Sequence, residues 1–411
     1  MADAITIDRL SKVYPGGNRA LHEVSLDVEP GTFLVLLGPS GSGKTTLLRS
    51  LAGIERISAG RILLGGTVVA DGQAHTPPDR RNLSMVFQDY ALWPHLTVRD
   101  NVAFALRRRR LGRPAARERA GAMLERVGLG PLAARYPNEL SGGEQQRVAL
   151  ARALVADTGL ILCDEPLSNL DADLRERMRV EISALVREAG ATTVYITHDQ
   201  AEAFALADRV GVLEHGRLVQ TGTPEEIYTH PASPFVARFT GLAGEFPVRI
   251  GGAADGDLVS VELDSASAGT VALRARAPHG PGAPGGPPGP PGPGGPGGLL
   301  AGGPGLLMVR PTGVHLTRTG PGECHLTGTV ADVAFRGRGY EHAIDIPGHG
   351  RLTGVFGRQR VSRGAAVGLR FAPEGCLVFA AAPPPGPADD PENQDTDPAH
   401  IHGPLEIQRQ T

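Results

Sequence analysis

Short apolar runs alternate with polar, charge-rich segments through the first 240 residues of the chain. Three runs are apolar at nearly every position, which is typical of strands buried on both faces of a parallel sheet: Phe33–Leu37, Leu160–Cys163 and Thr193–Ile196. Between the runs lie amphipathic segments such as Ala172–Glu188, where apolar residues recur at helical spacing. The alternation predicts an α/β fold built on a layered parallel sheet.

Beyond Gly241 the pattern changes to short, valine-rich segments punctuated by glycine. Six of them have the length and composition of strands: Leu258–Leu263, Val271–Arg276, Leu307–Leu316, Gly328–Phe335, His342–Ile346 and Leu369–Phe379. These segments predict a smaller all-β domain, either a barrel or a sandwich. Pro or Gly fills 19 of the 21 positions from Pro278 to Gly298, which predicts a semi-extended linker.

The same patterns predict the domain boundaries. We expect an α/β domain over 1–240, and an all-β domain over 241–380 that contains a Pro/Gly linker at 278–305. Residues 381–411 are rich in Pro, Asp and Gln and predict a disordered tail.

Composition narrows the function classes. The formal net charge of the 411 residues is -3, so no basic surplus indicates a nucleic-acid partner. The three cysteines have no CxxC spacing and fit a reducing compartment. An acidic N-terminus with no long apolar segment behind it predicts neither a signal peptide nor a membrane span, so we expect a cytoplasmic protein. Only Lys12 and Lys44 are lysines, which indicates that position 44 requires a compact ammonium.

Lys44 lies in a glycine-rich loop, Gly38–Thr45, between an apolar run and a helix start. This is the context of a phosphate-binding loop, in which backbone N–H groups curl around a polyphosphate. Lys44 is expected to neutralise the β and γ oxygens, and the Thr45 hydroxyl to ligate Mg²⁺. The motif that reads guanine in common GTPases requires a further lysine, so ATP is expected. The predicted binding positions are Gly38, Pro39, Ser40, Gly41, Ser42, Gly43, Lys44, Thr45 and Thr46.

Two carboxylates, Asp164 and Glu165, end the apolar run that begins at Leu160. In phosphoryl-transfer enzymes the first acid of such a pair holds Mg²⁺ and the second polarises the attacking water. Adjacent acids at a strand end are also common as helix N-caps. The presence of a phosphate loop favours the catalytic interpretation.

The segment Leu140–Gln146 reads LSGGEQQ and precedes an apolar helical stretch. On the residues alone, Ser141 is an N-cap, Glu144 completes a capping box, and the glycine pair that includes Gly143 exposes amide donors at a helix end that attracts anions.

The LSGGEQQ segment, the glycine loop and the strand ending in two acids together resemble the ATP-binding cassette of ABC transporters. The resemblance covers residues 5–240. Tyr14 stands where the family stacks an aromatic ring on adenine, although a loop tyrosine alone more often packs at the surface. Gln88 stands where a glutamine touches Mg²⁺ and relays nucleotide state to the membrane partner. Asp171 ends a segment similar to the loop that crosses the dimer interface. His198 matches the histidine that contacts the γ-phosphate.

The resemblance implies that two cassettes, in a homodimer or beside a similar subunit, sandwich ATP, with Ser141 and Gly143 of one chain facing the γ-phosphate held by Lys44 of the other. It implies Glu165, His198 and Lys44 as catalytic residues. It implies Thr45, Gln88 and Asp164 as ligands of Mg²⁺.

The region beyond 241 resembles, less specifically, the OB-like accessory (TOBE) domain of importer ATPases. We therefore expect an ATPase bound to permease subunits at the cytoplasmic face of the membrane, and served indirectly by a solute-binding protein. Ferric iron, a polyamine or a quaternary amine is the expected solute. The alternatives are an exporter cassette, which usually lacks such a domain, and a soluble ABC ATPase, which usually has two cassettes in one chain.

Overall fold

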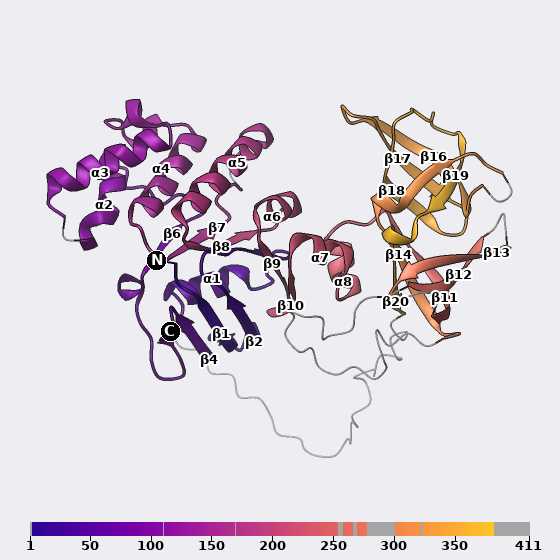
Figure 1. The fold of residues 1–411 in the computed structure, drawn as a ribbon, viewed down its shortest axis with the longest axis horizontal. Coiled ribbons are helices and arrows are strands. Elements are labelled where there is room, and N and C mark those ends of the chain that lie inside the picture. Colours follow the sequence, from indigo (N-terminus) through magenta and orange to yellow (C-terminus); the bar gives the residue numbers. More distant parts are fainter. Residues whose placement is uncertain are drawn as a thin grey trace, which may run out of the picture. The chain divides into compact units, whose positions relative to one another are not determined.

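The computed structural model describes residues 2–109, 111–168, 170–253, 258–265, 269–277, 301–320 and 323–381 (Figure 1). Residues up to Ala380 form one compact unit. The tail from 382 onward and the linker up to residue 300 lie outside the described residues, so both remain predictions. Residues 304 and 305, at the end of the predicted linker, belong to a strand.

A six-stranded sheet forms the centre of the first region, in the order β10-β9-β3-β8-β7-β6. Its strands are β3 (Phe33–Leu37), β6 (Leu83–Val86), β7 (Leu160–Asp164), β8 (Thr192–Thr197), β9 (Arg209–Glu214) and β10 (Arg217–Gly222). All neighbours pair in parallel except β9 and β10. Every residue of β3, β7 and β8 is buried, which confirms the three strands expected from the apolar runs.

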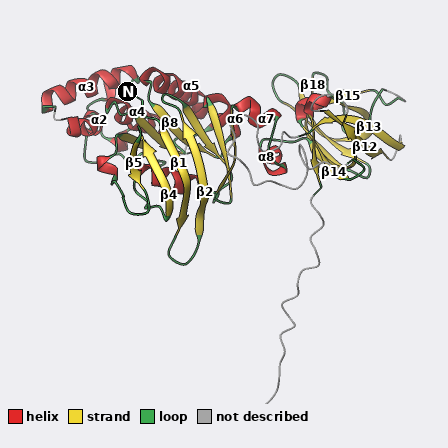
Figure 2. Ribbon diagram, turned by 60° about the horizontal axis from the view of Figure 1, so that its bottom comes forward, coloured by secondary structure: helices red, strands yellow, loops and turns green. Residues whose placement is uncertain are grey.

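A second, antiparallel sheet has the order β2-β1-β4-β5 (Figure 2). It comprises β1 (Ile5–Val13), β2 (Arg19–Val28), β4 (Ala59–Leu64) and β5 (Thr67–Ala70). Apolar side chains of this sheet, of β3 and of helix α1 (Lys44–Ala52) share one core cluster. Helix α1 is thereby fixed between the two sheets.

The helices of the first region include a packed group of α2, α3 and α4 (Figure 1). The helix bounds are α2 (Val98–Phe104), α3 (Arg113–Arg126), α4 (Gly142–Val155), α5 (Ala172–Ala189), α6 (Gln200–Leu206), α7 (Pro224–Thr229) and α8 (Pro234–Phe239). Short 3₁₀ turns lie at Pro78–Arg80, Ala105–Arg109, Gly130–Leu132 and Pro137–Glu139. Helix α5 matches the amphipathic segment expected there, and Gly190 caps its end with a φ of 60°.

The second region contains a closed barrel and a separate five-stranded sheet. The barrel consists of β11 (Gly244–Ala253), β12 (Leu258–Ser265), β13 (Gly269–Arg276), β14 (Pro304–Val309) and β20 (Cys376–Ala380). The sheet consists of β15 (Val314–Thr317), β16 (Leu326–Phe335), β17 (Tyr340–Ile346), β18 (Gly350–Gly357) and β19 (Ala366–Phe371).

Two segments expected as single strands, Leu307–Leu316 and Leu369–Phe379, are each broken into two. A 3₁₀ turn interrupts the first at Pro311–Gly313 and the second at Pro373–Gly375. Proline removes a ladder donor at each break. The two turns touch, because a Cβ on Gly313 would lie only 2.7 Å from the Cα of Gly375. The chain thus crosses between barrel and sheet twice at one point.

Arg310 joins the end of β14 to the last helices of the first region. Its guanidinium donates to the carbonyl oxygens of Ala237 (2.8 Å), Gly241 (2.6 Å) and Tyr228 (2.6 Å), and to the Thr240 hydroxyl (2.9 Å). It also lies 4.2 Å from the Tyr228 ring centroid. The side chain is buried, and burial lowers the pKa of Arg310 to about 10.

Candidate nucleotide-binding site

The glycine loop lies between the buried strand β3 and helix α1, as the sequence predicts. Gly43 has a φ of 101°, and a Cβ at this position would lie 2.6 Å from the Ala20 carbonyl oxygen. A side chain is therefore excluded here by both backbone conformation and space. The loop leads directly into the N-terminus of α1, where free N–H groups attract anions.

Lys44 is buried under this loop, where its Nζ donates to the carbonyl oxygens of Gly38 (2.7 Å) and Pro39 (2.9 Å). Burial lowers the pKa of Lys44, although the nearby carboxylates of Glu165 and Asp164 oppose that shift. The ammonium is thus held at the loop by two weak acceptors that a phosphate can replace. The buried Ser42 hydroxyl has no partner among the described residues, so the loop keeps a free polar group as well.

A cavity of about 600 Å³ opens above the loop. Its volume suits a small-molecule ligand. It is lined by Tyr14, Asn18, Arg19, Ala20, His22, Ser40, Gly41, Ser42, Gly43, Lys44, Thr45, Thr46, Glu165, His215 and Gly216. The lining brings the predicted residues from Ser40 to Thr46 together with Tyr14 and Glu165.

Four polar lining residues were missed by sequence reasoning: Asn18, Arg19, His22 and His215. The first three lie at or near the start of β2, and His215 lies in the turn between β9 and β10. These segments are far apart in the sequence and meet only in the folded chain, so no local spacing predicts that they share a cavity. Burial, followed by the charges of Arg217 and Arg19, lowers the pKa of His22.

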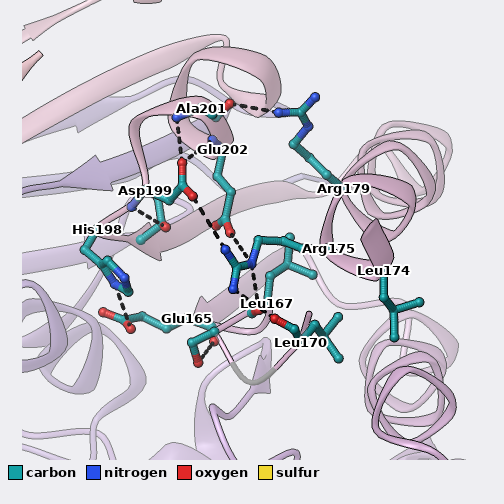
Figure 3. Close-up of polar contacts among 12 residues, drawn as sticks. Glu165, Leu167, Leu170, Leu174, Arg175, Arg179, His198, Asp199, Ala201 and Glu202 are labelled. Atoms are coloured by element: carbon teal, nitrogen blue, oxygen red, sulfur yellow. Dashed lines mark hydrogen bonds and ion pairs between the residues drawn. The ribbon is translucent and has the colours of Figure 1, made fainter. Parts of the chain in front are cut away.

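The two carboxylates stand at the end of β7 in different surroundings. Asp164 is buried, and desolvation raises its pKa, whereas Arg49, the Thr45 hydroxyl and Lys44 act in the opposite direction. Glu165 is partly buried and has a φ of 43°, an uncommon conformation for glutamate. Its Oε2 lies 3.2 Å from Nδ1 of His198, at the end of β8 (Figure 3). The structure therefore places the predicted base in contact with His198, the histidine expected to face the γ-phosphate.

Tyr14 follows β1 at the edge of the cavity. Its hydroxyl lies 3.4 Å from the Thr46 hydroxyl, and Lys12 Nζ lies 4.7 Å from its ring centroid. Lys12 is in turn paired with Glu55 at 3.0 Å. These contacts fix the ring beside the loop, as an aromatic platform for a base requires.

The remaining predicted residues do not line this cavity. Ser141 begins α4, where its hydroxyl donates to Glu144 Oε2 at 2.7 Å and its backbone N–H donates to the same oxygen at 2.7 Å. Gly143 is buried so tightly that a Cβ would lie 2.8 Å from Leu174 Cδ2. Asp171 accepts from the Leu174 N–H at 3.0 Å and caps α5. Gln88 follows β6 and also lies outside the cavity lining.

A buried strand, a glycine loop over a lysine, and a glutamate and histidine at the ends of neighbouring strands define a P-loop nucleotide hydrolase. The ABC transporter family profile matches residues 21–168, and the TOBE domain profile matches residues 307–379. The "Fe(3+) ions import ATP-binding protein" of Brucella abortus (strain 2308) is 42% identical over 349 residues, covering 85% of this chain and 89% of that protein. The chain belongs to the ATP-binding subunits of ABC importers.

Two further relatives match over a shorter part of the chain. A protein of the same description from Rhizobium etli is 51% identical over 246 residues, which cover 60% of this chain and 68% of the relative. The "Spermidine/putrescine import ATP-binding protein" of Acidothermus cellulolyticus is 52% identical over 242 residues, 58% of this chain and 62% of the relative. The family membership makes the chain an ATP-binding, ATP-hydrolysing subunit. Among the described residues, no helix has the length and apolar character needed to cross a bilayer.

Proposed function

We propose that this chain powers the import of a small solute, with ferric iron as the best-supported candidate. The observation that carries the solute is the match to the Brucella abortus Fe(3+) importer subunit, which runs through both the cassette and the β region. A polyamine is the second candidate, because the Acidothermus cellulolyticus relative is 52% identical over 242 residues. A quaternary amine is the third, from the resemblance of the sequence alone.

For hydrolysis, we propose that Glu165 polarises the attacking water and that His198 and Lys44 stabilise charge on the γ-phosphate. The 3.2 Å contact between Glu165 and His198 supports this assignment, because both groups then reach one point at the sheet edge. Tyr14 would stack on adenine, and Gly38–Thr46 would hold the phosphates.

The donor set also fits Mg²⁺. The Thr45 hydroxyl is a hydrogen-bond partner of the buried Asp164 carboxylate, and hard oxygen ligands are those that Mg²⁺ prefers. Gln88 would add an amide oxygen. No cluster of three or more acidic, histidine or cysteine ligands occurs among the described residues, which suits an ion held partly by substrate phosphates. The bound metal would neutralise phosphate charge.

We propose that two copies of the cassette close on ATP. Ser141, Gly143 and Asp171 do not line the cavity around Lys44, so one chain by itself does not contribute them to that site. A second copy would present the N-terminus of its α4, whose free N–H groups favour an anion. Closure would then complete the site and drive the permease.

We further propose that a membrane permease docks beside Gln88, from the cytoplasmic side. A cavity of about 760 Å³ lies there, and Phe87, Trp93, Phe104 and Arg152 are among its lining residues. Trp93 is 44% exposed, which is unusual for so large an apolar side chain. A helix of the permease would cover it, and a solute-binding protein would deliver the solute to the permease.

Glu165→Gln tests the hydrolytic role. The variant should bind ATP with unchanged affinity and lose nearly all turnover, because the amide no longer accepts a proton from water. Glu181→Gln, an exposed acid on α5, is the control and should keep wild-type turnover. Normal hydrolysis by Glu165→Gln would refute the assignment of the base.

Uptake of radioactive ferric iron tests the solute in cells of the source organism that lack this chain. Restoring the wild-type chain should restore ferric iron uptake, whereas Glu165→Gln should not. Restored spermidine uptake with no change in iron uptake would replace ferric iron by a polyamine.

Affinity capture from gently solubilised membranes tests the docking surface. The wild-type chain should recover a multi-span permease, and Trp93→Ala should recover much less. Tyr136→Ala is the matched control, because Tyr136 is 45% exposed and does not line the 760 Å³ cavity. Equal recovery with Trp93→Ala and with the wild-type chain would contradict docking at this cavity.

A further inference from the structure

Arg175, in the first turns of α5, lies between the segments that follow β7 and β8 (Figure 3). Toward the first segment, it donates from Nη2 to the Leu170 carbonyl oxygen at 2.9 Å and from Nε to the Leu167 carbonyl oxygen at 3.4 Å. This segment begins with Glu165 and ends at Asp171, the cap of α5. The guanidinium thus binds the backbone two and five residues after the proposed base.

Toward the second segment, the same guanidinium faces two carboxylates. Its Nη1 lies 3.9 Å from Asp199 Oδ2, and its Nε lies 4.0 Å from Glu202 Oε1. Asp199 is the neighbour of His198 in the chain and caps α6, accepting from the Ala201 N–H at 2.7 Å.

Glu202 anchors this side of the contact. It is buried and accepts from the Tyr195 hydroxyl at 2.9 Å, so its carboxylate cannot swing away with the loop. Burial raises the pKa of Glu202, and hydrogen bonds together with the charge of Arg175 act against that rise. Arg175 therefore connects the buried Glu202 on the β8 side to the backbone carbonyl oxygens of Leu167 and Leu170 on the β7 side.

We propose that Arg175 is a positioning residue that sets the separation of Glu165 and His198. Arg175 is expected to touch neither ATP nor water, and its role rests on the proposed roles of those two side chains. Strand pairing ends at Asp164 and Ile196, and one further bond, from the Glu165 N–H to the Ile196 carbonyl oxygen at 3.2 Å, holds the Glu165 backbone but not its side chain; His198 stands beyond these bonds. His198 is 59% exposed at its side chain, so packing does not hold it in place.

The residue type supports this role. A guanidinium presents five donors in a planar fork, and it can bind carbonyl oxygens and carboxylates on two sides at once. A lysine would supply a single point of charge. Displacing a reacting group by about 1 Å can lower a rate by about 100-fold, so small changes in the two segments would be measurable.

Arg175→Gln tests the proposal through steady-state hydrolysis of Mg-ATP by the full chain. The expected result is a kcat lower by about 10-fold or more, with a KM for ATP within about twofold of wild type, because the phosphate loop is untouched. Arg175→Lys should give an intermediate kcat. Arg179→Gln is the matched control, since Arg179 stands one turn further along α5 and its Nη1 donates to the Ala201 carbonyl oxygen at 3.2 Å. It should lower kcat by less than about twofold.

A double-mutant cycle separates positioning from a loss of folding. In a His198→Ala background, Arg175→Gln should lower the residual kcat by less than about threefold, because one of the two positioned groups is already gone. Equal fold-losses in both backgrounds, a raised KM with unchanged kcat, or a kcat within twofold of wild type would each overturn the proposal. Thermal unfolding of each variant establishes that it is folded.

The proposed roles of Glu165 and Arg175 can be refuted separately. If Glu165→Gln retains normal turnover, the role of Glu165 is wrong whatever Arg175 does. If Glu165→Gln is inactive and Arg175→Gln is fully active, only the positioning role is wrong.

Discussion

Replacing Arg310 with methionine should lower the free energy that holds the cassette and the β region together, at the joint around Arg310, by about 3 kcal/mol. Arg310 makes four hydrogen bonds to buried or partly buried acceptors. Hydrogen bonds from a charged donor contribute about 1.5–3 kcal/mol each, so the low estimate is about 6 kcal/mol. Burial lowers the Arg310 pKa to about 10, which corresponds to a burial cost of about 3 kcal/mol that methionine avoids, so the net loss is about 3 kcal/mol.

Amide hydrogen exchange at Ala243 reports this loss, because its N–H donates to the carbonyl oxygen of Val309, the residue before Arg310, at 2.7 Å where the barrel meets the joint. A loss of about 3 kcal/mol corresponds to exchange roughly 100-fold faster. Arg238→Gln is the control at the same joint. Arg238 pairs with Glu245 at 2.6 Å, but both side chains are substantially exposed, so the expected loss is about 0.5 kcal/mol.

Exchange at Ala243 that stays within about threefold of wild type in Arg310→Met would refute the reasoning. An effect of Arg238→Gln as large as that of Arg310→Met would also refute it, since burial would then not decide the strength of the joint.

Three further outcomes follow from single sites. Gly53→Ala should lower the thermal unfolding midpoint more than Gly66→Ala does: both glycines have φ near 78°, but only at Gly53 would the new Cβ meet another atom, Arg81 Nε at 2.6 Å; equal losses would contradict this. At pH 8 a thiol reagent should modify the partly exposed Cys324 quickly and leave Cys163 and Cys376, whose pKa burial raises to about 12, unmodified until denaturant is added. Burial raises the Asp164 pKa, so the ionised carboxylate lowers the stability of the folded chain above its folded pKa and has no effect below its unfolded pKa. Asp164→Asn should therefore raise the unfolding midpoint of the nucleotide-free chain more at pH 7 than at pH 4. An equal change at both pH values would contradict this sign.

The parts of the fold that could be predicted from sequence are those with a local cause. Largely apolar runs mark β3, β7 and β8 because strands covered on both faces have few polar positions. The glycine loop was located from its neighbours, a strand before it and a helix after it.

The antiparallel sheet formed by β1, β2, β4 and β5 had no such signal. The pairing of β1 with β2 shifts register repeatedly, and Arg9 has a φ of 44°, so the period-two pattern of a half-buried strand is interrupted. In the β region, the sequence could not show where one strand ends and the next begins across Pro311 and Pro373.

The candidate site also contains residues that a local motif predicts and residues that only the folded chain brings together. Residues Ser40–Thr46 are consecutive, so a motif predicts them together, and their place around one cavity agrees with it. His22 and His215 reach the same cavity from segments nearly two hundred residues apart, and only the folded chain relates them. The network around Arg175 is of this second kind, because its partners belong to different loops.

Because lysine is scarce in this chain, chemical labelling of its lysines reports on the nucleotide site alone. Lys12 and Lys44 are the only lysines of the chain, and both border the ends of the proposed ATP position, Lys12 beside the Tyr14 ring and Lys44 under the phosphate loop. An amine-acylating reagent therefore has two side-chain targets, and each lies on a different peptide. Mass spectrometry of those two peptides, with and without ATP, reads occupancy at the adenine end and at the phosphate end separately, in the unmodified wild-type protein and without any introduced label.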